Sequence, residues 1–109
     1  MFLPMRQFLK IYLDDERPAP ESWILVATPV DAIDYLKTGN VLSLSLDHDL
    51  GDDISIGTGY DVLSWIEEQV VLYGFVPPII DIHTANPSAR IKMSLALDTI
   101  KRYRRKYFP

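Results

Sequence analysis

The sequence predicts an α/β fold with a short, mostly parallel sheet of about four strands flanked by about three helices. Two observations lead to this prediction. Short apolar runs bounded by turn residues alternate along the chain with longer segments whose apolar residues recur at helical spacing. This alternation favours a parallel sheet, because each strand needs a crossover to return to the same edge. A chain of 109 residues can form one core, so residues 1–109 are expected to make a single domain.

Four apolar runs predict the strands. They are "FLKIYLDD" (8–15), "WILVAT" (23–28), "VLSLSLDHDL" (41–50) and "PPIIDIHTA" (77–85). In the third run leucines alternate with serines, which predicts one tightly packed face and one that meets smaller neighbours. The first two runs are separated by "ERPAPES", whose prolines exclude a continuous helix. An extended segment is therefore expected to connect these two strands.

Three segments predict helices, and each carries its own start or stop signal. The first begins at Thr28 as its N-cap, has a proline at the first helical position, and ends at Gly39. The second covers residues 60–74 and closes at a glycine. The third covers residues 86–107, with Asn86 as its cap and a proline directly after it.

Composition narrows the class of protein. There is no cysteine, so a disulfide framework and a thiolate metal site are both excluded. No stretch approaches the ~20 apolar residues that a bilayer-spanning helix needs. The start of the chain lacks an apolar core followed by a small-residue cleavage site, which is how a signal peptide is recognised. We therefore expect a cytoplasmic protein without a membrane partner.

The charge is unevenly distributed. The net charge is −4, yet residues 89–109 hold seven basic residues and one acid, whereas residues 1–88 hold four basic and fourteen acidic residues. Such a division predicts an anionic partner near the C-terminus, with nucleic-acid contact through the basic last helix, and a cation site elsewhere. The alternative is a solvated last helical turn, where cations also suit the helix dipole.

Polar residues follow three of the four predicted strands. In an open parallel sheet the carboxyl ends of the strands meet at one edge, where functional groups gather. Clustered carboxylates at such an edge repel one another unless a cation such as Mg²⁺ or Mn²⁺ lies between them. The predicted ligands are Asp14, Asp15, Asp47 and Asp49, with Asp49 alternatively orienting a histidine.

The same edge offers groups for phosphate chemistry. Histidine is the side chain best suited to general acid and general base catalysis near neutral pH, which predicts these roles for His48 and His83, beside Asp47. Arg17 can clamp a phosphate through two N–H groups. Further phosphate contacts are expected from the turn before the second helix and from the start of the last helix, at Thr58, Thr84 and Asn86.

Each of these assignments has a structural alternative. The aspartates after the first strand can cap the following turn, and His83 can be a core histidine with satisfied hydrogen bonds. Arg17 can pair with a neighbouring glutamate, and Thr84 can be an ordinary strand residue. Asn86 caps the last helix whether or not it also contacts a ligand.

These residues resemble the receiver domains of two-component signalling. There an acidic pair binds Mg²⁺, an aspartate accepts a phosphoryl group and a threonine senses it, which correspond to Asp14 and Asp15, Asp47, and Thr84. Two features depart from that pattern. The lysine after a fifth strand has no counterpart, and the helix between the first two strands is missing.

A receiver-like family named for the processing of cyclic phosphates is more similar. The likeness covers nearly the whole chain and rests on "LDDERPAP", "SLDHDLG", "GTGYDVL" and "HTANPSAR". It implies a three-layer, receiver-like (flavodoxin-like) fold without the fifth strand or the first helix. It also implies action on nucleotides or RNA ends that bear a cyclic phosphate.

Two functions from different classes are therefore expected. The first is a metal-assisted phosphoesterase that opens a cyclic phosphate on a nucleotide or RNA end. The second is a receiver or pseudo-receiver module that binds Mg²⁺ and a partner without turnover. A third possibility is that the basic helix binds nucleic acid while the acidic edge is structural.

Overall fold

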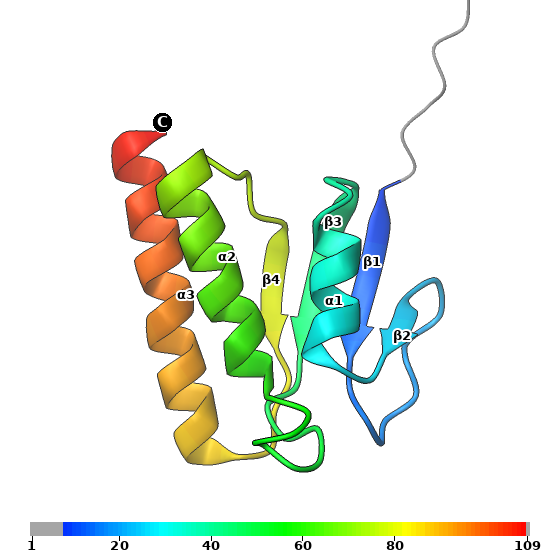
Figure 1. Ribbon diagram of the computed structural model, residues 1–109. Coiled ribbons are helices and arrows are strands. Elements are labelled where there is room, and N and C mark those ends of the chain that lie inside the picture. Colours follow the sequence, from blue (N-terminus) through cyan, green and yellow to red (C-terminus); the bar gives the residue numbers. More distant parts are fainter. Residues whose placement is uncertain (1–7, 109) are drawn as a thin grey trace, which may run out of the picture.

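The computed structural model describes residues 8–108 and has a four-stranded parallel sheet in the order β2-β1-β3-β4 (Figure 1). The strands are β1 (Leu9–Leu13), β2 (Ile24–Val26), β3 (Val41–Leu46) and β4 (Ile79–Ile82). The helices are α1 (Pro29–Leu36), α2 (Gly59–Tyr73) and α3 (Pro87–Tyr107). The predicted receiver-like α/β fold, its parallel sheet and its order of elements are confirmed.

The two faces of the sheet differ because side chains alternate along each strand. One face carries fully buried aliphatic side chains, among them Ile11, Leu13 and Leu44, which form one core with the helices. The other face carries Tyr12 and Ser45 in register on β1 and β3, where small and polar side chains replace the aliphatic ones. The alternation of leucine and serine in β3 is therefore the sequence signature of a two-sided strand.

All three helices of residues 8–108 lie on the aliphatic face. α1 contacts α2, and α2 contacts α3, so the three form one continuous layer (Figure 1). The cause is the right-handedness of parallel crossovers: from β2 to β3 to β4 the chain always advances in the same direction across the sheet. The third layer expected of a receiver-like fold is absent from the described residues. The crossover from β1 to β2 runs across the sheet in the opposite direction, so a helix in that crossover would cover the other face. This chain has no helix there.

Local signals set the helix ends as predicted. The Thr28 hydroxyl accepts a hydrogen bond from the Asp31 N–H at 3.2 Å, and the Asn86 side chain accepts one from the Ala89 N–H at 3.2 Å. α2 ends at Gly74, which has the left-handed conformation that glycine adopts without strain (φ 65°).

No helix within residues 8–108 is both long and apolar enough to cross a bilayer.

The strands are shorter than the apolar runs that predicted them. β1 ends at Leu13 and β3 at Leu46, so the aspartates that follow lie beyond the strands, in loops. Residues 14–23 connect β1 to β2 without a helix, as the prolines predicted. This shortening matters for function because it frees the polar side chains at the carboxyl edge from the sheet.

Candidate functional site

Three ionisable residues form one row across the carboxyl edge of the sheet. Leu13, Leu46 and Ile82 are in register as the last residues of three adjacent strands, so the residues after them become neighbours. The ladder continues one step further: the Asp47 N–H donates to the Leu13 carbonyl at 3.0 Å, and the His83 N–H donates to the Leu46 carbonyl at 2.9 Å. Asp14, Asp47 and His83 consequently each place one ligand atom within 4.8 Å of the others.

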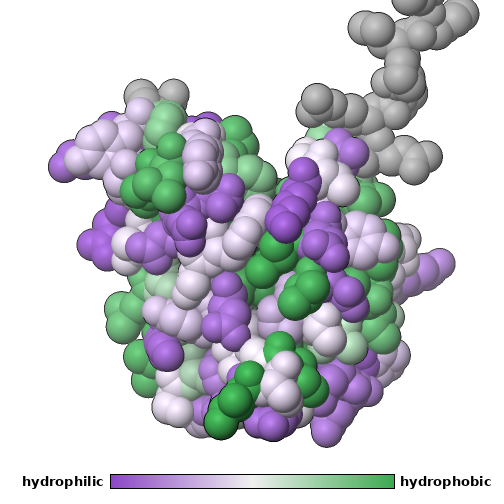
Figure 2. Space-filling view, viewed as in Figure 1, coloured by the Kyte–Doolittle hydropathy of each residue, from purple (hydrophilic) through white to green (hydrophobic). Residues whose placement is uncertain are grey.

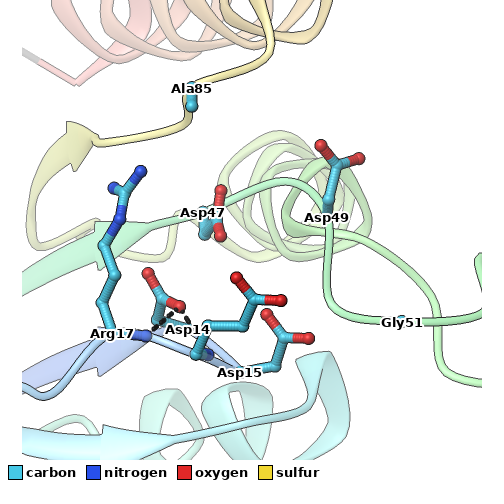
Figure 3. A pocket seen from close by; sticks show the side chains of 8 residues that line it. Asp14, Asp15, Arg17, Asp47, Asp49, Gly51 and Ala85 are labelled. Atoms are coloured by element: carbon cyan, nitrogen blue, oxygen red, sulfur yellow. Dashed lines mark hydrogen bonds between the residues drawn. The ribbon is translucent and has the colours of Figure 1, made fainter.

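An acidic pocket of about 290 Å³ opens beside this row (Figure 3). Five carboxylates and one guanidinium line it, and we call it the acidic pocket. In Figure 3 Arg17 rises on one side of Asp14 and Asp47, and Asp49 lies on the other. The lining residues are Asp14, Asp15, Glu16, Arg17, Asp47, Asp49, Gly51 and Ala85. All four predicted metal ligands and the predicted phosphate-binding arginine therefore meet in one pocket.

Asp14 is the most constrained of these carboxylates. It is 1% exposed, and its Oδ1 accepts hydrogen bonds from the N–H groups of Glu16 (2.9 Å) and Arg17 (2.8 Å). Burial by itself raises the pKa of Asp14, but these two N–H donors and the neighbouring His83 outweigh it, so the pKa lies below its usual value of 3.8. The chain thus holds a buried carboxylate in its charged form.

His83 has partners on both ring nitrogens. Nε2 lies 3.0 Å from the Asp14 Oδ2, and Nδ1 lies 2.7 Å from the Ser45 hydroxyl. The ring stacks on Tyr12, with centroids 4.2 Å apart and an interplanar angle of 4°. The Asp14 carboxylate accepts a hydrogen bond from Nε2–H, and Nδ1 then accepts one from the Ser45 O–H. His83 therefore has the satisfied hydrogen bonds that the structural alternative expected. Its Nε2 is nevertheless one of the three possible ligand atoms of the cluster with Asp14 and Asp47.

Arg17 is fixed through its backbone and through one end of its side chain. Its N–H binds Asp14, and its Nη1 donates to the His83 carbonyl at 2.6 Å. Within residues 8–108 it forms no ion pair with a glutamate, which was the structural alternative for this residue. The remaining guanidinium N–H groups line the acidic pocket, where they can donate to a phosphate.

His48 lies beside the pocket but not among its lining residues. Its Nδ1 is 2.8 Å from the Asp49 Oδ1, and the Asn86 Nδ2 donates to the other oxygen of Asp49 at 3.4 Å. Asp49 accepts a hydrogen bond from Nδ1–H, which leaves the lone pair on Nε2. The prediction that Asp49 orients a histidine is thus one of the two arrangements that the geometry allows, the other being metal coordination from the pocket wall.

The two predicted phosphate-binding threonines do not line the pocket. Thr84 is only 2% exposed, and its hydroxyl accepts a hydrogen bond from the Asn86 N–H at 3.2 Å. Thr58 caps α2, and its N–H donates to Asp61 at 2.8 Å. Thr84 lies at a turn and Thr58 at a helix start. Threonine is common at such positions as well as in phosphate sites, so the residue type alone does not predict which role it has.

Gly59 ties α2 to the site. Its N–H donates to the His48 carbonyl at 3.1 Å, and a Cβ at this position would lie 1.8 Å from the Asp47 carbonyl oxygen. Only glycine permits this approach, so the "GTG" turn brings the start of α2 against the loop that carries Asp47. Gly59 thus allows close packing between two backbone segments of the site, rather than close approach of a bound phosphate.

Three contributing residues were not predicted: Glu16, Ser45 and Tyr12. Glu16 adds a fifth carboxylate to the pocket, and the other two hold the His83 ring. Strand parity contains the missing signal, since Tyr12 and Ser45 precede Asp14 and Asp47 by two residues and share their side of the sheet.

The comparisons with known proteins agree with this geometry. The model of the cyclic-phosphate processing receiver domain matches residues 9–99. The chain belongs to this family. Neither a curated protein nor a solved structure matches it. The match covers all four strands and most of α3, and so includes each residue of the acidic pocket.

The donor set of this family member fits a metal ion. Two carboxylates and one imidazole, with ligand atoms within 4.8 Å of one another, can coordinate a single divalent cation. The exposed Asp15, Glu16 and Asp49 add further negative charge around that point. Asp14, Asp47 and His83 could therefore form a metal site.

Proposed function

We propose that this chain is a metal-assisted phosphoesterase that opens a cyclic phosphate on a nucleotide or an RNA end. The observation that carries the proposal is the row of Asp14, Asp47 and His83 with Arg17 beside it in one acidic pocket. Three cation ligands next to a guanidinium that has no carboxylate partner within residues 8–108 form a surface for a phosphoryl group. The five carboxylates alone would repel the negative charge of that group.

Asp14, Asp47 and His83 would hold the cation. When bound, it offsets the negative charge that develops on the phosphoryl oxygens. The imidazole favours Mn²⁺ over Mg²⁺, because Mg²⁺ prefers oxygen ligands throughout. For Nε2 to act as a ligand the ring proton must move to Nδ1. The Ser45 hydroxyl oxygen, 2.7 Å away, can accept a hydrogen bond from that Nδ1–H. We therefore assign His83 to the cation rather than to proton transfer.

Arg17 would bind the phosphate. Its Nη1 is anchored to the His83 carbonyl, which positions the planar guanidinium without using its other donors. Those donors can form two parallel hydrogen bonds to phosphate oxygens. The pocket, at about 290 Å³, is at the lower limit for a small-molecule site, so it suits the phosphate and sugar better than a whole nucleotide.

His48 would act as general base. With Nδ1–H held by Asp49 at 2.8 Å, Nε2 can take a proton from a water at the rim of the pocket. That water forms the new P–O bond while one P–O ester bond of the ring breaks. One of its protons ends on the sugar hydroxyl that leaves, and the other stays with the phosphomonoester.

A receiver-like module that binds a cation without turnover is the alternative. The observation that favours it is that both ring nitrogens of His83 are occupied by protein partners. Asp47 then takes the place of the phosphoacceptor, and the pocket serves a protein partner instead of a substrate.

The test is turnover of 2′,3′-cyclic nucleotides and cyclic-phosphate-ended RNA with Mg²⁺, with Mn²⁺ and with a chelator. We expect opening that is fastest with Mn²⁺ and stops with the chelator. Asp14→Asn should reduce it at least ~100-fold by removing a cation ligand, whereas Asp34→Asn, on the exposed side of α1, should not change it. Tight Mn²⁺ binding with no turnover on any substrate would instead favour the receiver-like module.

A further inference from the structure

We propose that the substrate is a single RNA strand whose body lies along α3, while its terminal cyclic phosphate occupies the acidic pocket. This inference rests on the proposed function and names its substrate class. It comes from a second charged region of the molecule, the cationic residues at the far end of α3 from the pocket. We call residues 101–106 the basic end.

The basic end is free to bind an anion. It carries Lys101, Arg102, Arg104, Arg105 and Lys106. In the part of the chain that the structure describes, none of these side chains pairs with a carboxylate. Hydrophilic side chains lie over the upper part of α3 in Figure 2. Five unpaired cations within six residues exceed what one helix dipole attracts, which favours a polyanion as partner.

Helical spacing connects this end to the pocket. Arg90, Lys101 and Arg105 recur on one side of α3, three turns and then one turn apart. Lys92 marks the opposite side, because its ammonium lies 4.0 Å from the ring centroid of Tyr60 on α2. The stripe of Arg90, Lys101 and Arg105 therefore lies on the side of α3 away from α2.

Arg90 anchors the stripe at the site. Its Nη2 donates to the Thr84 carbonyl at 2.7 Å and its Nη1 to the Ile82 carbonyl at 3.3 Å, directly next to His83. The guanidinium keeps its positive charge beside the backbone on either side of His83. A phosphate chain leaving the pocket thus meets one cation at once and the next group of cations further along the helix.

The length of α3 sets the length of the strand. The fifteen residue steps from Arg90 to Arg105 span about 22 Å at 1.5 Å per residue. At the phosphate spacing of a stacked strand or a more extended one, this distance corresponds to about four to seven nucleotides. A mononucleotide cannot reach from the pocket to the basic end, so only an oligonucleotide can use both.

Two tyrosines near the basic end lie outside the stripe, on the side of α3 that Lys92 marks. Tyr103 packs against the hydrophobic core, and the Lys106 ammonium lies 5.2 Å from the ring centroid of Tyr107. The strand is therefore expected to be held by its phosphates rather than by stacking on these rings. Because a 2′,3′-cyclic phosphate requires a ribose with a 2′-hydroxyl, the strand is RNA.

The experiment measures fluorescence anisotropy of labelled oligouridylates of about two to twelve nucleotides, ending in a 3′-hydroxyl, with a chelator present. Binding is thereby separated from turnover and from the metal. We expect affinity to rise with length and to level off near about seven nucleotides. Equal affinity for every length, or no binding at low salt, would overturn the proposal; an acidic protein partner would then be the better occupant.

Two double variants of matched charge locate the strand. K101A/R105A removes the stripe, whereas R102A/K106A removes two cations from other sides of the same helix. We expect the first to weaken binding on the order of tenfold and to lower the salt slope by about 1.4, as for two lost phosphate contacts on a single strand. Equal losses in both would mean diffuse attraction and would contradict the stripe.

Turnover provides the link to the proposed function. If oligonucleotides with a cyclic end and 2′,3′-cyclic mononucleotides open at equal kcat/KM, the phosphoesterase stands and the strand proposal fails. If neither opens while length-dependent binding persists, the phosphoesterase fails and α3 stands only as an RNA-binding surface.

Discussion

The two ends of this molecule carry opposite charges and are built in different ways. At the acidic end, Asp14 is 1% exposed and held by two backbone N–H groups, and its neighbours come from three strands in register. At the basic end, five cations lie within six residues of one helix. The acidic end therefore depends on the whole fold, whereas the basic end depends on the local sequence of α3.

This difference has a consequence for binding. An anionic substrate is attracted by the basic end in any state of the protein, but the five carboxylates of the pocket repel it until a cation is present. Association with the strand should thus depend on salt, and engagement of its terminal phosphate should depend on metal. Substitutions at the acidic end should also affect stability more than substitutions at the basic end.

The largest difference is expected from a pair of glycine substitutions. Gly59→Ala at the acidic end would place a Cβ 1.8 Å from the Asp47 carbonyl oxygen, so the backbone must move, and we expect a loss of ~3 kcal/mol or more in the free energy of unfolding. Gly74→Ala at the basic end meets only the Phe108 ring, at 3.2 Å, and a left-handed φ of 65°, which costs about 1–2 kcal/mol. Urea unfolding measures both. A Gly74→Ala loss as large as that of Gly59→Ala would contradict the stated contrast.

A smaller effect is expected from the ligand role of His83. His83→Ala should weaken Mn²⁺ binding by at least ~10-fold, measured by isothermal titration calorimetry. Ser45→Ala, which removes only the partner of Nδ1, should weaken it less, because Nε2 stays in place. A variant that unfolds more easily yet binds Mn²⁺ normally would mark His83 as a core residue instead. The basic-end variant K101A/R105A should leave Mn²⁺ binding unchanged.

The smallest effect concerns pH and the metal-free protein. The pKa of Asp14 is lowered in the folded state, so its charged form stabilises the fold above the ordinary value of 3.8, and this contribution is lost as the pH falls through the lower folded pKa. Urea midpoints between about pH 5 and about pH 2 should therefore fall more steeply for the native chain than for Asp14→Asn. Parallel curves would show that other carboxylates dominate the acid transition.

Particular residues show how far the sequence could predict the site. Asp14, Asp15, Asp47 and Asp49 were expected at the carboxyl edge because each follows an apolar run, and all four line the pocket. His48 also follows a run, yet it lies outside the lining, although Asp47 and Asp49 in the same loop belong to it. Strand parity could have added Tyr12 and Ser45, but it does not extend into the loops.

The sequence by itself determined the order of strands and helices, the helix starts at Thr28 and Asn86, and the cations of α3. These depend on hydrogen bonds and periodicity within a few residues. Only the tertiary structure decided that Asp14, Asp47 and His83 form one row and that the helices form one layer. Those features depend on the register between strands and the direction of crossovers, which bring together residues far apart in the chain.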